Sequence, residues 1–286
     1  MTKKKSMGIF YIIVSAFCFA CMGLFVRLAG DLPSVQKSFF RNLIAFLMAV
    51  SMILKDRVPV KITKDAIVPL LLRSAAGTIG IFCNFYAVDH LPVADASMLN
   101  KLSPFFVVIF SYLILKENVK WYQSLCILAA FAGSLFVIRP STDLFQNPAS
   151  LIGVLGGLTA GMAYTFVRLC SQKGVKGPVI VAVFSGFSCL VSLPELIFDY
   201  TPMSGIQIVF LLLAGLAAAG GQFSITAAYT YAPAREISVY DYSQIIFSTI
   251  LGLVVLGELP DAYSFIGYGI IIGASVVMFL LNQKNS

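Results

Sequence analysis

The feature that most constrains this chain is a series of long apolar runs separated by short polar connections. A helix needs about 20 apolar residues to cross the roughly 30 Å hydrocarbon core of a bilayer. Backbone groups inside lipid must be hydrogen-bonded within their own segment, so each run is expected to be a helix. The sequence therefore predicts an all-α integral membrane protein with ten transmembrane helices. The runs cover residues 8–29, 34–54, 67–89, 93–115, 120–138, 151–171, 178–198, 205–231, 235–257 and 263–281.

The composition excludes a soluble fold and argues against an enzyme. The 286 residues are 59% hydrophobic and 12% charged, whereas soluble domains carry roughly 25% charge. The sequence has no phosphate-binding loop of the form G-x-x-x-x-G-K-[ST] and no nucleophile-elbow or zinc-protease motif. It has a single histidine, and its six cysteines lie inside apolar runs, so a metal site is not indicated. We expect no catalysis, no ATP hydrolysis and no cofactor.

The net charge of +7 is distributed as in a membrane protein, not as on a nucleic-acid-binding surface. With the N-terminus inside, fourteen lysines and arginines fall on the cytoplasmic side, three fall outside and three lie within spans. Positively charged connections tend to stay in the cytoplasm. Both chain ends are therefore predicted to be cytoplasmic, in the plasma (inner) membrane of a prokaryote. The expected surroundings are the lipid bilayer, with no nucleic acid as partner.

The chain also repeats itself at an interval of 141 residues. The sequence PVADAS at residues 92–97 matches PAREIS at 233–238, and LKE at 115–117 matches LGE at 256–258. Five spans per half is an odd number, so the second half must lie upside down relative to the first. Inverted repeats around a site at mid-membrane are typical of secondary transporters. We predict two inverted five-helix repeats around a central cavity, formed by residues 1–145 and 149–286.

Several short motifs, taken in order, resemble the EamA family of the drug/metabolite transporter superfamily. They are SAF at 15–17, FRNLIA at 40–45, LSP at 102–104 and the L-x-E ends at Glu117 and Glu258. The resemblance implies a ten-helix bundle with a central cavity, spans 5 and 10 at its periphery, and transport of small metabolites. It implies no particular substrate. Where the first half has Ser103-Pro104, the second has Gln244-Ile245, so a proline kink is expected in span 4 only.

Polar residues inside spans 4 and 9 are the strongest candidates for a substrate site. Asn100-Lys101 and Asp241-Tyr242 hold corresponding positions in the repeat, and charged residues inside membrane helices usually face a cavity or a partner. Asp241, Gln244 and Ser248 recur at helical spacing and so share one face. Two interpretations remain open. Lys101 binds an anionic group and Asp241 an amine or proton, or the two form a structural ion pair that locks the halves together.

Other polar and aromatic side chains complete the predicted site. Asn84 lies in the middle of span 3, where an unpaired amide is costly and a ligand can satisfy it. Tyr240 and Tyr242 flank Asp241 and can offer a ring face and a hydroxyl to a substrate. The predicted substrate-binding residues are Asn84, Asn100, Lys101, Tyr240, Asp241, Tyr242 and Gln244.

Three charged residues are predicted to act in gating or in structure: Arg41, Glu117 and Glu258. Arg41 lies near the outer end of span 2, where it either attracts an anion or snorkels to the interface. Glu117 and Glu258 end corresponding helices on opposite sides of the membrane. Arg73 lies in the first two turns of span 3, and we expect it to snorkel to the cytoplasmic interface.

These features predict a secondary carrier that moves a small organic solute by alternating access. A lysine beside an aspartate and amides suits a zwitterionic or anionic solute such as an amino acid. Proton coupling through Asp241, uniport and exchange remain open, as do a monomer and a homodimer. Two rival functions are a lipid-headgroup flippase, which needs a laterally open groove, and a membrane sensor or assembly protein, which produces no solute flux.

Overall fold

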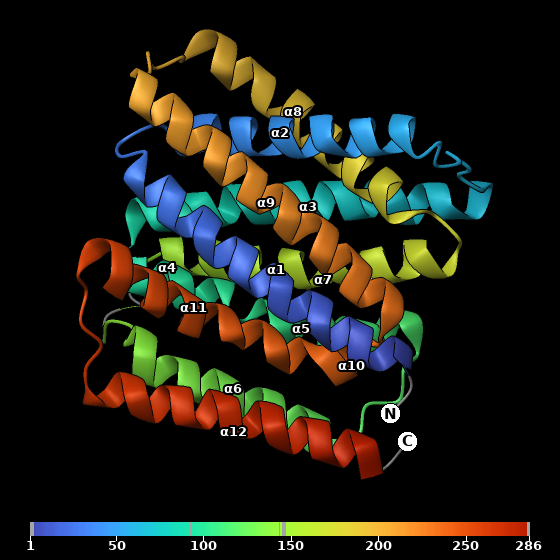
Figure 1. Ribbon diagram of the computed structural model, residues 1–286, viewed down its shortest axis with the longest axis vertical. Helices are drawn as coiled ribbons and strands as arrows, with labels where there is room; N and C mark the ends of the chain where they lie inside the picture. The colour runs from blue at the N-terminus through green and yellow to red at the C-terminus, as the bar shows by residue number, and fades with distance from the viewer. Residues whose placement is uncertain (1–2, 92, 143, 145–146, 285–286) are drawn as a thin grey trace.

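The computed structural model describes residues 3–91, 93–142, 144 and 147–284, which form a bundle of helices without a strand (Figure 1). Ten of these helical segments are long and apolar enough to cross a membrane, so the predicted all-α transmembrane fold class is confirmed. The first part of the chain forms α1 (Lys3–Leu28), α2 (Ser34–Lys55), α3 (Lys64–His90), α4 (Val93–Asn100), α5 (Ser103–Leu115) and α6 (Trp121–Ile138). The second part forms α7 (Ala149–Gln172), α8 (Gly177–Phe198), α9 (Gly205–Tyr231), α10 (Ala234–Ile237), η2 (Ser238–Tyr242), α11 (Ser243–Leu251), η3 (Gly252–Leu256) and α12 (Ala262–Lys284).

Spans 4 and 9 are both interrupted at corresponding places. The junction of α4 and α5 comes just before Pro104, as expected. In span 9, the 3-10 helix η2 separates α10 from α11, although no proline is present there. Ser238 and Ser243 explain this second break, because they donate hydrogen bonds to nearby carbonyls (Ala234 O at 2.6 Å and Tyr240 O at 2.7 Å) and so compete with α-helical bonding. The sequence interpretation predicted the proline break and missed the one in span 9.

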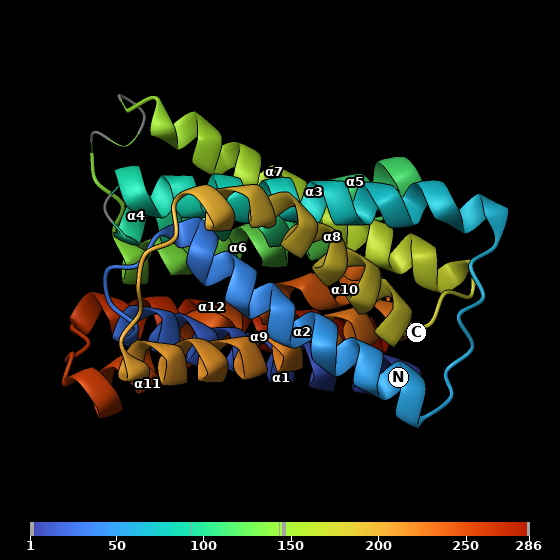
Figure 2. The ribbon, with the colours of Figure 1, turned by 90° about the horizontal axis from the view of Figure 1, so that it is seen from above.

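The helices pack in pairs that join the two parts of the chain, as Figure 1 and Figure 2 show. The helix α1 packs along α9, α3 along α7 and α2 along α8. The helices α6 and α12 pack on each other at one edge of the bundle, where the family resemblance placed spans 5 and 10. Gly133 and Gly267 bring the backbones of α6 and α12 together, since a Cβ on Gly267 would meet Gly133 O at 2.5 Å. Small residues at such crossings are typical of membrane helices.

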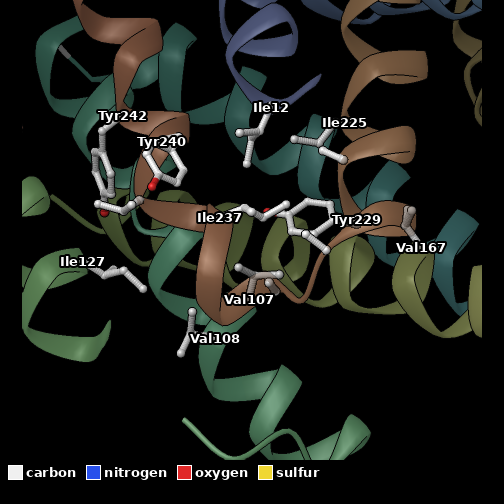
Figure 3. Packing of buried hydrophobic residues seen from close by; sticks show 14 of the residues in the cluster. Ile12, Val107, Val108, Ile127, Val167, Ile225, Tyr229, Ile237, Tyr240 and Tyr242 are labelled. Carbon is white, nitrogen blue, oxygen red and sulfur yellow. The ribbon is translucent and has the colours of Figure 1, made fainter. Parts of the chain in front are cut away.

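The apolar core lies where the two parts of the chain meet. Figure 3 shows Ile12, Val167 and Ile225 packed around Tyr229, with contributions from α1, α7 and α9. On the outside, many large apolar side chains are exposed; Phe198, for example, is 83% exposed. Such a surface is unfavourable in water and suits contact with lipid chains. The core therefore fixes the two parts against each other and leaves their outer faces to the bilayer.

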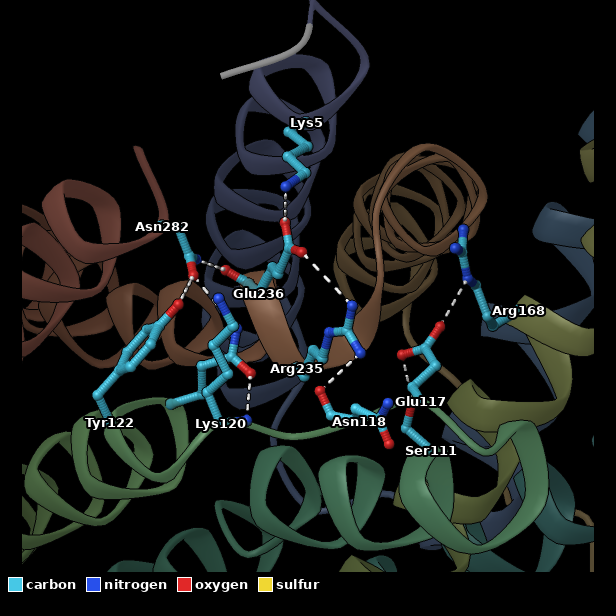
Figure 4. Close-up of polar contacts among 11 residues, drawn as sticks. Lys5, Ser111, Glu117, Asn118, Lys120, Tyr122, Arg168, Arg235, Glu236 and Asn282 are labelled. Atoms are coloured by element: carbon cyan, nitrogen blue, oxygen red, sulfur yellow. Dashed lines mark hydrogen bonds and ion pairs between the residues drawn. The ribbon is translucent and has the colours of Figure 1, made fainter. Parts of the chain in front are cut away.

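The bundle has two distinct ends, and α1 runs from one to the other. Near its start, Lys5 pairs with Glu236 at 3.1 Å; near its end, Arg27 pairs with Glu258 at 2.6 Å. Glu117 lies at the end where α1 begins, close to α10 (Figure 4). Glu117 and Glu258 therefore lie at opposite ends of the bundle, as an inverted repeat predicts. The start of α1 and the end of α12 lie at one end, and the connection from η3 to α12 lies at the other (Figure 1).

Candidate functional site

A cavity of about 580 Å³ lies between the two parts of the chain, within the size range of small-molecule sites. Every described helical element except α10 and η3 contributes to its lining. Arg27, Glu258 and Pro260 line one end of the cavity, which we call the mouth. The Arg27 and Glu258 side chains are 62% and 51% exposed, so this end of the cavity is accessible. From the mouth, the cavity extends inward to Arg73 and Lys101.

Five of the seven predicted substrate-binding residues line this cavity: Asn84, Asn100, Lys101, Asp241 and Gln244. The Lys101 ammonium donates to Gln244 Oε1 at 2.6 Å and pairs with Asp241 Oδ2 at 3.3 Å. The side chains of Lys101 and Asp241 are only 7% and 13% exposed. The ion pair considered from the sequence is therefore present, and it joins span 4 to span 9 at the cavity wall.

Tyr240 and Tyr242 lie behind the cavity wall instead of lining it. Both belong to the buried apolar cluster (Figure 3). The Tyr242 hydroxyl donates to the carbonyl of Lys101 at 3.0 Å, so it connects the interrupted region of span 9 to that of span 4. The Tyr240 hydroxyl has no hydrogen-bond partner among the described residues. The structure thus separates these two rings from the five polar residues that share the cavity.

Arg73 points into the cavity, and the expectation that it snorkels to the interface is wrong. It is only 2% exposed. Its guanidinium donates to Gln222 Oε1 at 3.2 Å, and the guanidinium carbon Cζ lies 4.0 Å from the centroid of the Phe184 ring. The error came from the helix boundary. The helix α3 begins at Lys64, three residues earlier than the apolar run suggested, which places Arg73 deeper in the bundle.

Arg41 lines the same cavity from α2 and is 9% exposed. Its Nε has no hydrogen-bond partner, and no acidic side chain in the described part of the chain forms an ion pair with it. The family motif containing this arginine therefore supplies a cavity residue. Arg27, at the mouth, is a third cavity arginine, and the sequence interpretation did not single it out.

The end opposite the mouth is held together by polar contacts, and we call it the closed end (Figure 4). Glu117, just after α5, accepts a hydrogen bond from Ser111 Oγ at 2.6 Å and pairs with Arg168 Nε at 3.4 Å. One Arg168 nitrogen also donates to the carbonyls of Tyr229 and Thr230, each at 3.0 Å. These contacts join α5, α7 and the end of α9 into one layer.

A second group of contacts extends this layer across α10 and α12. The Glu236 carboxylate is paired with Lys5, and the backbone carbonyl of Glu236 accepts a hydrogen bond from the Asn282 amide at 3.4 Å. The Tyr122 hydroxyl donates to Asn282 Oδ1 at 3.0 Å. Arg235 donates to the carbonyl of residue 118 at 2.7 Å. Ionic and backbone contacts thus seal the cavity at this end, whereas its mouth is open.

The fold and the cavity together define a multi-pass membrane protein with a polar pocket at its centre. The chain belongs to the EamA-like transporter family: the family model matches residues 6–139 and matches again at 147–280. The predicted family is therefore confirmed, and the protein is a membrane transporter.

Relatives of known name are similar along nearly the whole chain. The chain is 29% identical over 273 residues to the pseudopaline exporter of Pseudomonas aeruginosa, with 95% of each protein covered. It is 24% identical to the riboflavin transporter of Brucella anthropi, covering 96% of this chain and 98% of that one. It is also 24% identical to solute carrier family 35 member G1 of Homo sapiens, covering 96% and 80%. A crystal structure with 17% sequence identity has a TM-score of 0.84 over 98% of this chain and 99% of its own, and it shares the fold.

Proposed function

We propose that this protein is a secondary carrier of the inner membrane of a prokaryote, which moves a small organic solute by alternating access. Relatives named as an exporter of pseudopaline and a transporter of riboflavin support a small organic molecule as cargo. In the proposed topology both chain ends are cytoplasmic, so the closed end faces the cytoplasm and the mouth faces outward. Residues 1–145 and 149–286 act as two halves that move around the cavity.

The observation that carries this proposal is a pair of matching ion pairs, one at each end of the bundle. The sequence FVRL occurs at residues 25–28 and again at 166–169. Arg27 and Arg168 are therefore 141 positions apart, the same interval as between Glu117 and Glu258. Arg168 pairs with Glu117 at the closed end, and Arg27 pairs with Glu258 at the mouth. Each pair joins one half to the other.

The backbone around the two glutamates also matches. Lys116 and Gly257, which precede them, both have left-handed backbones with φ of 54° and 71°. The Glu117 N–H donates to the carbonyl of Ser111 at 3.3 Å, and the Glu258 N–H donates to the carbonyl of residue 252 at 3.2 Å. The same turn therefore presents a carboxylate to an arginine at either end. We call the two arrangements the inner latch (Glu117–Arg168) and the outer latch (Glu258–Arg27).

The two latches differ in burial. The inner latch side chains are 11% and 16% exposed, and those of the outer latch are 51% and 62% exposed. The inner latch is also reinforced because Arg168 donates hydrogen bonds to two backbone carbonyls at the end of α9. These differences support a cycle in which the latch at one end is buried while the latch at the other end is exposed. Transport exchanges the two states.

The proposal is tested by cysteine labelling from each side of the membrane. Ser248 lines the cavity, and none of the six native cysteines does, so a Ser248→Cys variant reports access to the cavity. With a membrane-impermeant maleimide, labelling is expected from the mouth side alone. Adding Glu117→Gln removes the charge of the inner latch and is expected to allow labelling from the other side as well.

Asp65→Asn is the matched control, because Asp65 forms an ion pair with Lys173 at the same end of the bundle but is 63% exposed. This substitution should leave the labelling pattern unchanged. Equal labelling of Ser248→Cys from both sides before any latch is altered would contradict the proposal. So would an inner-side signal that fails to rise in the Glu117→Gln variant.

A further inference from the structure

The inner part of the cavity carries more positive than negative charge. Of the described residues that line it, Arg41, Arg73 and Lys101 are basic and Asp241 is acidic, whereas Glu258 lies at the mouth and is paired with Arg27. Lys101 is already neutralised by Asp241. Arg41 and Arg73 therefore leave two positive charges in the cavity without an acidic partner in the described part of the chain.

Both arginines are buried enough for the missing partner to matter. Arg41 is 9% exposed and Arg73 is 2% exposed, and the Nε of each lacks a hydrogen-bond partner. Removing an ionised group from water is unfavourable unless an opposite charge compensates. The two charges are also close enough to interact with each other. Repulsion between them adds to the cost that a bound anion would relieve.

The surroundings hold the Arg73 guanidinium in a fixed orientation. Its plane is supported by the Phe184 ring at 4.0 Å, and Gln222 accepts one of its hydrogen bonds at 3.2 Å. A planar guanidinium that is already oriented loses little further freedom when it binds, and it matches a carboxylate or phosphate with two parallel hydrogen bonds. Asn84, in the same cavity, adds an amide that can donate to a third oxygen.

We propose that Arg41 and Arg73 form an anion subsite in the cavity, and that the solute it binds is a net-negative organic molecule bearing carboxylate or phosphate groups. The Lys101–Asp241 pair lies in the same cavity and faces the remainder of the solute. This assignment rests on the proposed carrier function only for the claim that the bound anion is moved. Binding itself can be measured without flux.

The test is a thermal-shift measurement on the purified full-length protein with a thiol-reactive dye, which reports the six free cysteines as they become exposed on unfolding. The probes are succinate, inorganic phosphate and putrescine, each at matched ionic strength. A ligand that binds only the folded protein raises its melting temperature. We expect stabilisation by succinate, phosphate or both, and none by the dication putrescine.

Variants then locate the bound anion. Arg41→Gln and Arg73→Gln should each weaken binding of the stabilising anion at least about tenfold, the loss expected for one charged hydrogen-bonding partner. Arg73→Lys keeps the positive charge but cannot form the two parallel hydrogen bonds of a guanidinium, so we expect an intermediate affinity. This variant replaces Arg73→Gln in the test if Arg73→Gln does not fold. Arg57→Gln makes the same charge change in the exposed α2–α3 connection and should leave the affinity unchanged.

The outcomes separate the subsite from the carrier function. Succinate binding without phosphate binding identifies carboxylates as the recognised groups, and the reverse identifies phosphates. Absence of stabilisation by either anion at millimolar concentration, or undiminished binding in Arg41→Gln together with Arg73→Lys, overturns the subsite. Anion binding that depends on the arginines, combined with a cavity equally accessible from both sides, would leave the subsite in place and reject the carrier.

Discussion

Lys101 is the residue through which the two parts of the chain are most directly connected at the cavity. Its side chain contacts Asp241 and Gln244, and its carbonyl accepts the Tyr242 hydroxyl. All three partners belong to span 9, whereas Lys101 lies at the interruption of span 4. A solute that draws Lys101 or Asp241 away from this arrangement therefore alters the contact between the two halves.

Removing one member of this ion pair should destabilise the protein more than removing both. Asp241→Asn leaves the Lys101 charge buried with only a neutral amide beside it, and we expect the free energy of unfolding to fall by about 3 kcal/mol. The double variant Asp241→Asn/Lys101→Met removes both charges and should recover most of that loss. Denaturant unfolding in mixed micelles measures both values. A double variant no more stable than Asp241→Asn would contradict this prediction.

Sequence patterns located five polar residues of the cavity, including those beside the two helix breaks. Asp241 and Gln244 could be placed on one face by their spacing, and Asn100 and Lys101 by their position in the repeat. Asp241 also lies in the 3-10 stretch, but an interval of three residues returns to the same face there, so it still shares the face of Gln244. Tyr240, one position before Asp241, is rotated about 120° away from that face. The orientation of a side chain next to such a break depends on hydrogen bonds that no periodic pattern reports.

At the scale of elements, the contact between α6 and α12 depends on a close approach of backbones. Gly133 and Gly267 face each other, and a side chain on either would meet backbone atoms of the other helix. In a bilayer, the hydrophobic effect contributes little to such pairing, so packing of this kind provides much of the attraction. The edge of the bundle therefore depends on these two positions.

Gly267→Ala should separate the two helices and reduce stability. The new methyl group would lie 2.5 Å from the Gly133 carbonyl oxygen, and overpacking of this kind costs about 1–3 kcal/mol. Gly269→Ala is the matched control on the same helix, because a Cβ there meets no atom within 4 Å. Thermal unfolding of both variants tests the prediction. Equal melting temperatures would show that α6 and α12 adjust without cost.

The elements themselves were predictable because bilayer thickness fixes the length of a span. All ten apolar runs correspond to candidate spans in the structure. The start of α3 was placed three residues late, since Lys64 and Asp65 do not look like part of an apolar run although they are helical. With the earlier start of α3, Arg73 lies further from the end of the helix than the apolar run indicated, and it lines the cavity.

At the scale of the whole molecule, the two latches are alike in their charged residues, and besides their burial and the α9 carbonyls they differ at the residue six positions before each glutamate. Ser111 donates a hydrogen bond to Glu117 at 2.6 Å. The corresponding residue in the second half is Gly252, which lies next to Glu258 and has no side chain to donate. The glutamate of the inner latch therefore accepts a serine hydrogen bond that has no counterpart in the outer latch.

This difference predicts the state in which the empty protein rests. A hydrogen bond to a charged group contributes about 1.5–3 kcal/mol, which corresponds to roughly a 10- to 150-fold preference for a closed inner latch. Ser111→Gly should reduce that preference and increase labelling of Ser248→Cys from the side of the closed end in the empty protein. Ser124→Gly serves as a control in α6. Labelling that is the same in Ser111→Gly as in its parent would argue against the assignment.

A resting protein that favours one closed latch should affect the kinetics of transport but not its net direction. It makes the binding pocket available first to molecules arriving from one compartment, so the half-saturating concentrations on the two sides should differ. It cannot choose the direction of net movement, because a preference of the unloaded protein enters the forward and reverse cycles equally. Whether such a protein imports or exports is then decided by the concentrations, and any coupled gradient, in the cell that makes it.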